Sequence, residues 1–215
     1  MAVEVKICGL TRPEDAALAV AHGAWRLGVI FAGGPRLVDV ARAREIVAAA
    51  AGVPVLGVFG PREVSDIRDV AAAVGLSGVQ LHGRSDAISS GILRAGGLEV
   101  WRVAALDVGS KLGEELAERA AAADALLVEP SHPERSGGRG VALTRELALA
   151  ARRAAPPIQF VLAGGLGPEN VAELIRVVGP DAVDVSSGVE SAPGRKDAGR
   201  LIRFLEIVRD ARASH

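Results

Sequence analysis

Short apolar runs alternate with longer amphipathic segments along the whole chain. Each short run has near-continuous apolar or β-branched character, which is typical of strands buried on both faces of a parallel sheet. Eight such runs predict eight strands, at Val3–Ile7, Leu27–Phe31, Val55–Phe59, Gly78–Leu81, Glu99–Val103, Ala125–Val128, Gln159–Leu162 and Ala182–Val185.

Helical periodicity fills the intervals between these runs. Apolar side chains at helical spacing form one stripe along each of three segments, Val64–Val74, Val171–Val178 and Leu201–Val208. Pro13 and Pro168 stand where a first helical turn is expected, a position that tolerates the missing N–H of proline. The pattern therefore predicts a helix or a short helical turn after each strand.

Strict alternation of strand and helix leaves two α/β architectures, a closed (β/α)8 TIM barrel and a doubly wound open sheet. Eight repeats in 215 residues lie at the small end for a barrel. An open sheet more often has fewer strands, so the barrel is favoured, as one domain over residues 1–215. In a barrel the residues that follow the strands gather at the C-terminal face, where barrel enzymes carry their active sites.

Composition excludes several classes of function. The formal net charge of -1, with arginines scattered among acidic residues, argues against a nucleic-acid surface. The only cysteine is Cys8, so no disulfide within the chain indicates an oxidising compartment. No apolar run approaches the roughly 18 residues of a membrane span, and the N-terminus lacks a long apolar targeting segment. The composition predicts a cytoplasmic protein without a membrane or nucleic-acid partner.

The loops after the last two predicted strands indicate an anion site. Gly164 and Gly165 would let backbone N–H groups approach an anion closely, because no β-carbon stands in the way. Ser186, Ser187 and Gly188 could start a short helix whose N–H groups point to the same place. The alternative is two tight turns, but adjacent terminal loops of this kind favour phosphate binding.

Other strand ends carry candidate chemistry, each with a simpler alternative. Cys8 could be a base or a small buried side chain, and Glu129 a partly desolvated general acid or a surface glutamate. Arg36 follows two glycines and a proline, which suits a carboxylate or phosphate contact as well as a solvated arginine. Gln80 and His82 end the fourth predicted strand, and His82 could bind substrate or cap the strand.

Nucleotide-binding motifs do not fit the glycine-rich segments. The stretch that starts at Gly164 lacks the G-x-G-x-x-G spacing of a dinucleotide fold, and it lies late in the chain. The segment Gly137-Gly138-Arg139-Gly140 lacks the ending of a P-loop. We interpret it as a loop after the sixth strand that closes over substrate.

Taken together, five ordered motifs resemble the phosphoribosylanthranilate isomerase family of tryptophan biosynthesis. The resemblance runs from Val5 to Arg209. The motifs are Val5–Thr11, Pro35-Arg36, Val79–Gly83, Leu162–Leu166 followed by Pro168–Val171, and Val183–Glu190.

The resemblance implies an aldose-ketose isomerase that performs an Amadori rearrangement on a phosphorylated small molecule, without a cofactor or metal. It implies that Cys8 is the general base, whose thiolate is favoured by the iminium that forms beside it, and that Arg36 faces the anthranilate carboxylate. It also implies substrate contacts from Gln80 and His82. The phosphate-binding positions that it implies are Gly164, Gly165, Ser186, Ser187 and Gly188. The chain is expected to be a monomer or a homodimer.

The acid position departs from the family pattern. The family typically has an aspartate at the end of the sixth strand, where this chain has Glu129. One added methylene moves the carboxyl by about one C–C bond length, a displacement that can matter for rate. The loop that follows, residues 130–141, also lacks the aromatic residue expected there. Two alternatives stay open, a related phosphoribosyl isomerase of histidine biosynthesis and a catalytically silent phosphate-binding barrel.

Overall fold

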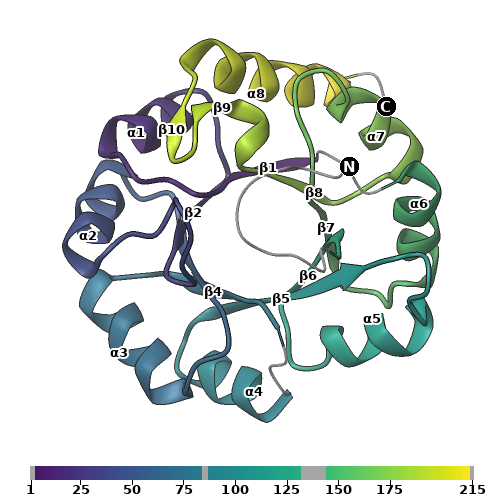
Figure 1. Ribbon diagram of the computed structural model, residues 1–215, viewed down its shortest axis with the longest axis horizontal. Coiled ribbons are helices and arrows are strands. Elements are labelled where there is room, and N and C mark those ends of the chain that lie inside the picture. The colour runs from purple at the N-terminus through teal and green to yellow at the C-terminus, as the bar shows by residue number, and fades with distance from the viewer. Residues whose placement is uncertain (1–2, 84–86, 132–143, 214–215) are drawn as a thin grey trace.

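Eight parallel strands close into a barrel with helices around it, so the predicted (β/α)8 architecture is confirmed (Figure 1). The computed structural model describes residues 3–83, 87–131 and 144–213. The segment read as a closing loop, Gly137-Gly138-Arg139-Gly140, lies outside these residues. The strands are β1 (Glu4–Ile7), β2 (Arg26–Ile30), β3 (Val55–Phe59), β4 (Gly78–Leu81), β5 (Glu99–Leu106), β6 (Ala125–Pro130), β7 (Gln159–Leu162) and β8 (Ala182–Val185).

The helices form an outer ring around the sheet (Figure 1). They are α1 (Pro13–Ala21), α2 (Val40–Ala49), α3 (Val64–Val74), α4 (Ala87–Ala95), α5 (Leu112–Ala120), α6 (Arg145–Ala154), α7 (Val171–Val178) and α8 (Ala198–Ala213). In the described residues, none of the helices has both the length and the apolar character required to cross a membrane.

Two boundaries differ from the sequence prediction in ways that matter for the site. Strand β6 continues to Pro130, so Glu129 belongs to the strand itself and pairs in register with Ala105 of β5. Pro13 does lie in the first turn of α1, as predicted. The placement of Pro168 in a first helical turn is wrong, because α7 begins only at Val171 and Pro168 lies in the turn before it.

A short hairpin that the sequence did not predict follows the last barrel strand. After β8 the chain forms the 3-10 helix η1 (Ser187–Val189) and then the strands β9 (Glu190–Ala192) and β10 (Arg195–Lys196). The hairpin lies beside α1 (Figure 1), where the Lys196 backbone N–H donates to the Asp15 carboxylate over 3.1 Å. It therefore holds the last loop of the barrel against the first helix.

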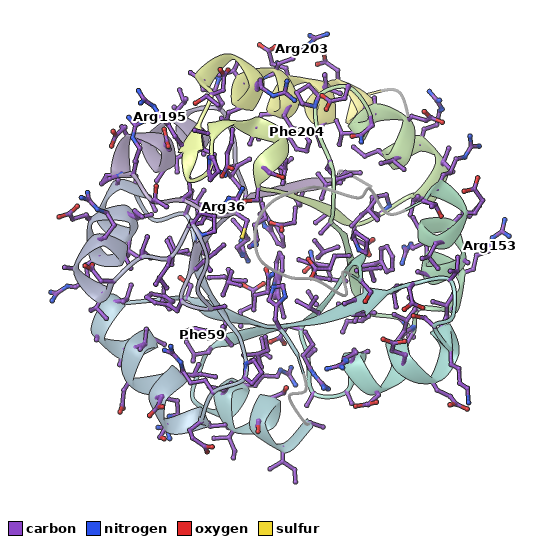
Figure 2. The ribbon with its side chains drawn as sticks, in the orientation of Figure 1. Arg36, Phe59, Arg153, Arg195, Arg203 and Phe204 are labelled. Atoms are coloured by element: carbon purple, nitrogen blue, oxygen red, sulfur yellow. The ribbon has the colours of Figure 1, made fainter. Side chains whose placement is uncertain are left out.

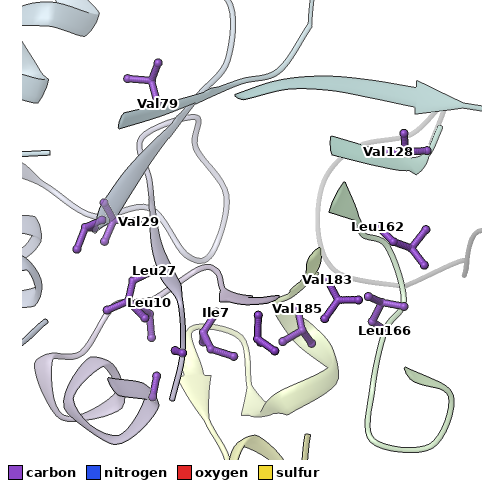
Figure 3. Close-up of a cluster of buried hydrophobic side chains, with 14 of the residues drawn as sticks. Ile7, Leu10, Leu27, Val29, Val79, Val128, Leu162, Leu166, Val183 and Val185 are labelled. Carbon is purple, nitrogen blue, oxygen red and sulfur yellow. The ribbon is translucent and has the colours of Figure 1, made fainter. Parts of the chain in front are cut away.

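The larger hydrophobic cluster lies between the sheet and the helical ring. Alternate strand residues such as Ile7, Leu27, Val183 and Val185 are almost completely buried in it (Figure 3). Side chains alternate across a strand, so the residues between them point into the barrel. Lys6 and Cys8 are therefore interior residues of the first strand and its end.

A smaller hydrophobic cluster lies inside the barrel around Trp101. Trp25 packs beside it, with 5.9 Å between the two ring centroids. At the N-terminal ends of β2 and β5, Arg26 and Glu99 form an ion pair of 3.0 Å, and the Trp101 indole N–H donates to Glu99 over 2.7 Å. These groups close the barrel at the N-terminal end of the strands, which leaves the C-terminal end for polar side chains.

Candidate active site

Lys6 and Cys8 lie side by side inside the barrel. The Lys6 ammonium is completely buried and donates to Asp184 Oδ1 over 2.7 Å and to Gln80 Oε1 over 2.8 Å. A β-carbon on Gly28 of the neighbouring strand would lie 2.8 Å from Cys8 Sγ and 3.2 Å from Lys6 Nζ. The absence of a side chain at Gly28 therefore makes the room for both groups.

The electrostatics of this pair keep Lys6 charged and Cys8 protonated in the free protein. Burial by itself lowers the pKa of Lys6, but the Asp184 carboxylate and Cys8 raise that pKa above its ordinary value. Burial raises the pKa of the Cys8 thiol, and the nearby Lys6 ammonium only partly offsets this. In the free protein desolvation therefore outweighs the neighbouring positive charge, so the lower pKa that a general base needs is not present before substrate binds.

A line of polar contacts continues from Lys6 across the barrel to Glu129. The Gln80 amide Nε2 lies 2.8 Å from His82 Nε2. On the other side of the imidazole ring, His82 Nδ1 lies 3.4 Å from Glu129 Oε1. Both side chains are mostly but not fully buried, at 14% and 16% exposure, so this end of the line reaches the mouth of the barrel.

Arg36 lies inside the helical ring (Figure 2), where it is fixed by a carboxylate of the same chain. Its Nε and Nη2 donate to Glu190, at 2.9 and 2.7 Å. The same Glu190 accepts a bond of 2.9 Å from the buried Lys196 ammonium. Burial tends to raise the pKa of Glu190, but Arg36 and Lys196 together hold it below its ordinary value. The guanidinium is thus held in one orientation, and within the described part of the chain no hydrogen bond engages its Nη1.

Lys196 ties three loops of the site together. Besides Glu190, its ammonium donates to the backbone carbonyls of Cys8 and Ser186, at 2.6 and 3.1 Å. Burial lowers the pKa of Lys196, and Glu190 opposes that change. The cation therefore fixes the backbone of the strand end that carries the thiol relative to the loop after β8.

The two loops predicted to bind phosphate are in direct contact. A β-carbon on Gly188 would lie 1.8 Å from the Leu166 carbonyl oxygen, so only glycine allows the loops after β7 and β8 to pack this closely. Gly164 has φ +89°, and a β-carbon there would lie 2.1 Å from Pro130 at the end of β6. The predicted short helix at Ser186–Gly188 is present as η1, which spans Ser187–Val189.

Gly165 and Ser187 belong to the same two loops, and Ser186 Oγ lies beside Gly9 at the end of the first strand. Within the described residues this buried hydroxyl has no hydrogen-bond partner. A β-carbon on Gly9 would lie 2.6 Å from Ser186 Oγ and 2.6 Å from the Arg36 side chain. The rim of the loops after β7 and β8 therefore adjoins both the first strand end and the predicted carboxylate-binding arginine.

Sequence reasoning missed four residues that organise the site. They are Gly28, Asp184, Glu190 and Lys196; the first was recognisable as a glycine inside a strand, a sign of close approach. Asp184 interrupts an apolar strand, and the structure pairs it with Lys6. Nothing in the local pattern connects Lys196 with Cys8, because their contact joins residues 188 positions apart.

A closed (β/α)8 barrel whose strand ends bring together a thiol, carboxylates, a guanidinium and a buried ammonium has the architecture of a barrel enzyme. Residues 5–207 match the family model described as "N-(5'phosphoribosyl)anthranilate (PRA) isomerase". The chain therefore belongs to the N-(5'-phosphoribosyl)anthranilate isomerase family.

Individual relatives agree with this assignment over nearly the whole chain. The chain is 39% identical over 206 residues to an N-(5'-phosphoribosyl)anthranilate isomerase of Neisseria meningitidis serogroup C, covering 94% of this chain and 95% of the relative. Monomers generated from the dimeric phosphoribosylanthranilate isomerase of Thermotoga maritima superpose with a TM-score of 0.83 at 34% identity, covering 97% of this chain and 99% of that one.

A third similar structure is a phosphoribosylanthranilate isomerase in complex with reduced 1-(o-carboxyphenylamino)-1-deoxyribulose 5-phosphate. It has a TM-score of 0.82 and 33% identity, and the similarity covers 97% of this chain and 99% of that chain.

Proposed function

We propose that this chain converts N-(5-phosphoribosyl)anthranilate into 1-(2-carboxyphenylamino)-1-deoxyribulose 5-phosphate, a step of tryptophan biosynthesis. Membership of the family supports the reaction, and so does the similarity to a structure that holds a reduced form of this product. The observation that carries the residue roles is the line of contacts Lys6–Gln80–His82–Glu129, which brings the candidate acid into the same interior network as the ammonium beside Cys8.

Glu129 is the proposed general acid. It protonates the furanose ring oxygen, and the C1–O bond breaks to give an open-chain iminium. The lone pair of the anilino nitrogen supplies the electrons that replace the broken bond. Glu129 lies in an interior, partly buried position, which favours retention of the proton until substrate is bound.

Cys8 is the proposed general base. Its thiolate removes the proton from C2 of the sugar, the C2–H electron pair forms the C1–C2 double bond, and the C=N π pair moves to the nitrogen to give an enolamine. The enolamine then tautomerises to the ketone. In the free protein burial keeps the thiol protonated, so the positive charge of the iminium beside it supplies the stabilisation of the thiolate that the empty site lacks.

The remaining residues are proposed to bind the two anionic ends of the substrate. The free Nη1 of Arg36 faces the anthranilate carboxylate, because Glu190 already occupies Nε and Nη2. The phosphate binds the rim formed by Gly164, Gly165, Ser186, Ser187 and Gly188, where the Ser186 hydroxyl is available as a donor. Gln80 and His82 line the space between these two ends.

The proposal treats residues 1–215 as one barrel domain that acts in the cytoplasm without a membrane or nucleic-acid partner. A monomer and a homodimer are both compatible with it, and the relative from Thermotoga maritima is described as dimeric.

Rescue of a tryptophan auxotroph that lacks this isomerase is the decisive experiment. Growth on minimal medium supports the function, whereas failure of a well-expressed, folded protein to rescue growth favours the catalytically silent barrel. Purified protein should also be assayed with the phosphorylated aminoimidazole substrate of histidine biosynthesis. Turnover of that compound alone would assign the chain to the related isomerase.

A further inference from the structure

The contacts of Gln80 are fixed by a group that can only donate. An ammonium has three N–H donors and no acceptor, so the amide atom 2.8 Å from Lys6 Nζ must be the oxygen. Lys6 stays charged, because Asp184 lies 2.7 Å away and the side chain is completely buried beside it. The Gln80 amide therefore has only one orientation, with its NH₂ group turned to His82.

This orientation determines which nitrogen of His82 carries hydrogen. The Gln80 NH₂ group donates, so His82 Nε2, at 2.8 Å, must accept through its lone pair. In a neutral imidazole the hydrogen then resides on Nδ1, the nitrogen that lies 3.4 Å from Glu129 Oε1. Turning the ring over would place carbon atoms toward both partners, so the contacts also fix the ring itself.

We propose that His82 is a positioning residue for Glu129: Lys6, acting through Gln80, holds His82 as the Nδ1–H tautomer, and this N–H orients the glutamate that serves as acid. The inference rests on the proposed function for its catalytic half. The N–H contacts Oε1, and the carboxyl held in this way carries the proton toward the substrate. Once that proton is transferred, the same N–H stabilises the carboxylate that remains.

The His82–Glu129 contact matters because the glutamate side chain is longer than the aspartate expected at this position. A glutamate has one more rotatable bond than the aspartate expected at this position, so its carboxyl has more orientations to lose before it can act. A fixed donor at the mouth of the barrel limits those orientations. His82 and Gln80 thus act through Glu129 in addition to any contact that they make with substrate.

The tautomer can be measured without any assay of activity. Protein labelled with ¹⁵N-histidine is examined by two-bond ¹H–¹⁵N correlation at about pH 8. We expect the Nδ1–H pattern for His82, assigned by its loss in His82→Asn. The exposed His22 at the end of α1 serves as the internal control, since no such constraint acts on it. An Nε2–H or imidazolium pattern for His82 overturns the proposal.

A near-isosteric change at Gln80 should switch the tautomer. In Gln80→Glu one carboxylate oxygen still accepts from Lys6, and the other now presents an acceptor to His82 Nε2. His82 must then donate from Nε2, as the Nε2–H tautomer or as imidazolium. If the Nδ1–H pattern persists in folded Gln80→Glu, Gln80 does not control the ring and the proposal fails.

Two replacements of His82 separate positioning from mere packing. An asparagine amide can place an N–H where Nδ1 stood, whereas a glutamine amide reaches the position of Nε2. We expect kcat to fall about 10- to 100-fold in His82→Gln and by a clearly smaller factor in His82→Asn, whereas loss of a substrate contact should raise KM to a similar extent in both. His22→Asn is the matched control and should leave both constants unchanged. Equal losses in the two His82 variants, or a raised KM with normal kcat, contradict the positioning role.

The proposed function and the positioning role of His82 can each be wrong without the other. If the unaltered protein shows no turnover of N-(5-phosphoribosyl)anthranilate, the proposed function is wrong, and the tautomer measurement still decides whether Lys6 and Gln80 fix His82. If turnover is normal and the tautomer is Nε2–H, the positioning proposal alone is wrong. Thermal unfolding of each variant, followed by circular dichroism, shows that the fold is retained.

Discussion

Lys6 Nζ and Asp184 Oδ1 are 2.7 Å apart at the seam where the first strand of the barrel meets the last. The two residues are direct register partners, and both side chains point into the barrel interior. The same ammonium lies beside Cys8 and donates a hydrogen bond to Gln80. The same buried ion pair thus connects the first and last strands of the barrel and positions the polar groups of the site.

Removing one partner of this pair should be costly. Asp184→Asn leaves the buried Lys6 ammonium without its counter-charge, and we expect a loss of about 3–5 kcal/mol in the free energy of unfolding. The double variant Lys6→Met/Asp184→Leu removes both charges, so it should lose clearly less stability. Urea denaturation followed by circular dichroism measures both values. A single variant as stable as the parent would show that Lys6 is not charged in the folded protein.

The Cys8 thiol should resist alkylation at neutral pH. Its pKa is raised by burial, so the thiolate fraction in the free protein grows only above the ordinary value of about 8.5. We expect slow modification by iodoacetamide at about pH 7 and faster modification as the pH rises, measured by mass spectrometry of the intact protein. The same titration predicts that kcat/KM rises toward alkaline pH as the thiolate forms. Rapid labelling at neutral pH, compared with the urea-unfolded chain, would contradict this direction.

Loss of either proposed proton-transfer group should abolish most of the turnover. Cys8→Ala and Glu129→Ala are each expected to lower kcat by about 10²- to 10⁴-fold, the range typical of positioned acids and bases. Both side chains can be shortened without leaving a buried charge, so the fold should persist. Near-normal turnover in Cys8→Ala would show that the base is another group.

A methyl group at Gly28 should disturb the site without unfolding the barrel. In Gly28→Ala the new carbon would lie 2.8 Å from Cys8 Sγ, so the thiol has to move. We expect kcat to fall about 10- to 100-fold and stability to fall by about 1–3 kcal/mol. Gly91→Ala is the matched control, because its β-carbon in α4 meets open space and alanine favours a helix by about 0.5–1 kcal/mol. A control variant with equally reduced kcat would refute the local explanation.

Arg36→Ala should act mainly on substrate binding. A charge-assisted hydrogen bond contributes about 1.5–3 kcal/mol, so KM should rise by roughly 10- to 100-fold while kcat changes less. Arg153 projects outward from the helical ring (Figure 2), and Arg153→Ala provides the control for loss of an arginine far from the site. An unchanged KM in Arg36→Ala would count against the carboxylate contact.

The sequence predicted the barrel because its strands are buried on both faces. Continuous apolar runs such as Val55–Phe59 leave little doubt about where a strand begins and ends, and this strand was placed correctly. The end of β6 was harder, since Glu129 and Pro130 do not have the composition of a strand. They belong to it because β5 continues alongside and offers backbone partners up to Leu106.

The site was only partly visible in the sequence. Strand ends can be found from local patterns, so Cys8, Arg36 and Glu129 could be chosen as candidates. The groups that hold them in place are distant in the chain, as Glu190 is from Arg36. The hairpin that carries Lys196 consists of strands of three and two residues, too short to show any periodicity. Pairings of this kind depend on how the barrel closes.

Because β1 hydrogen-bonds to β8, the thiol and the neighbouring serine loop come from opposite ends of the polypeptide. A ribosome therefore finishes seven strands before β8, the second partner of β1, exists. Until β8 emerges, Lys6 has no counter-ion and Cys8 has no Lys196 to hold its carbonyl. The chemistry of this protein is consequently a property of the completed ring, and no nascent portion that lacks the final strand and hairpin contains it.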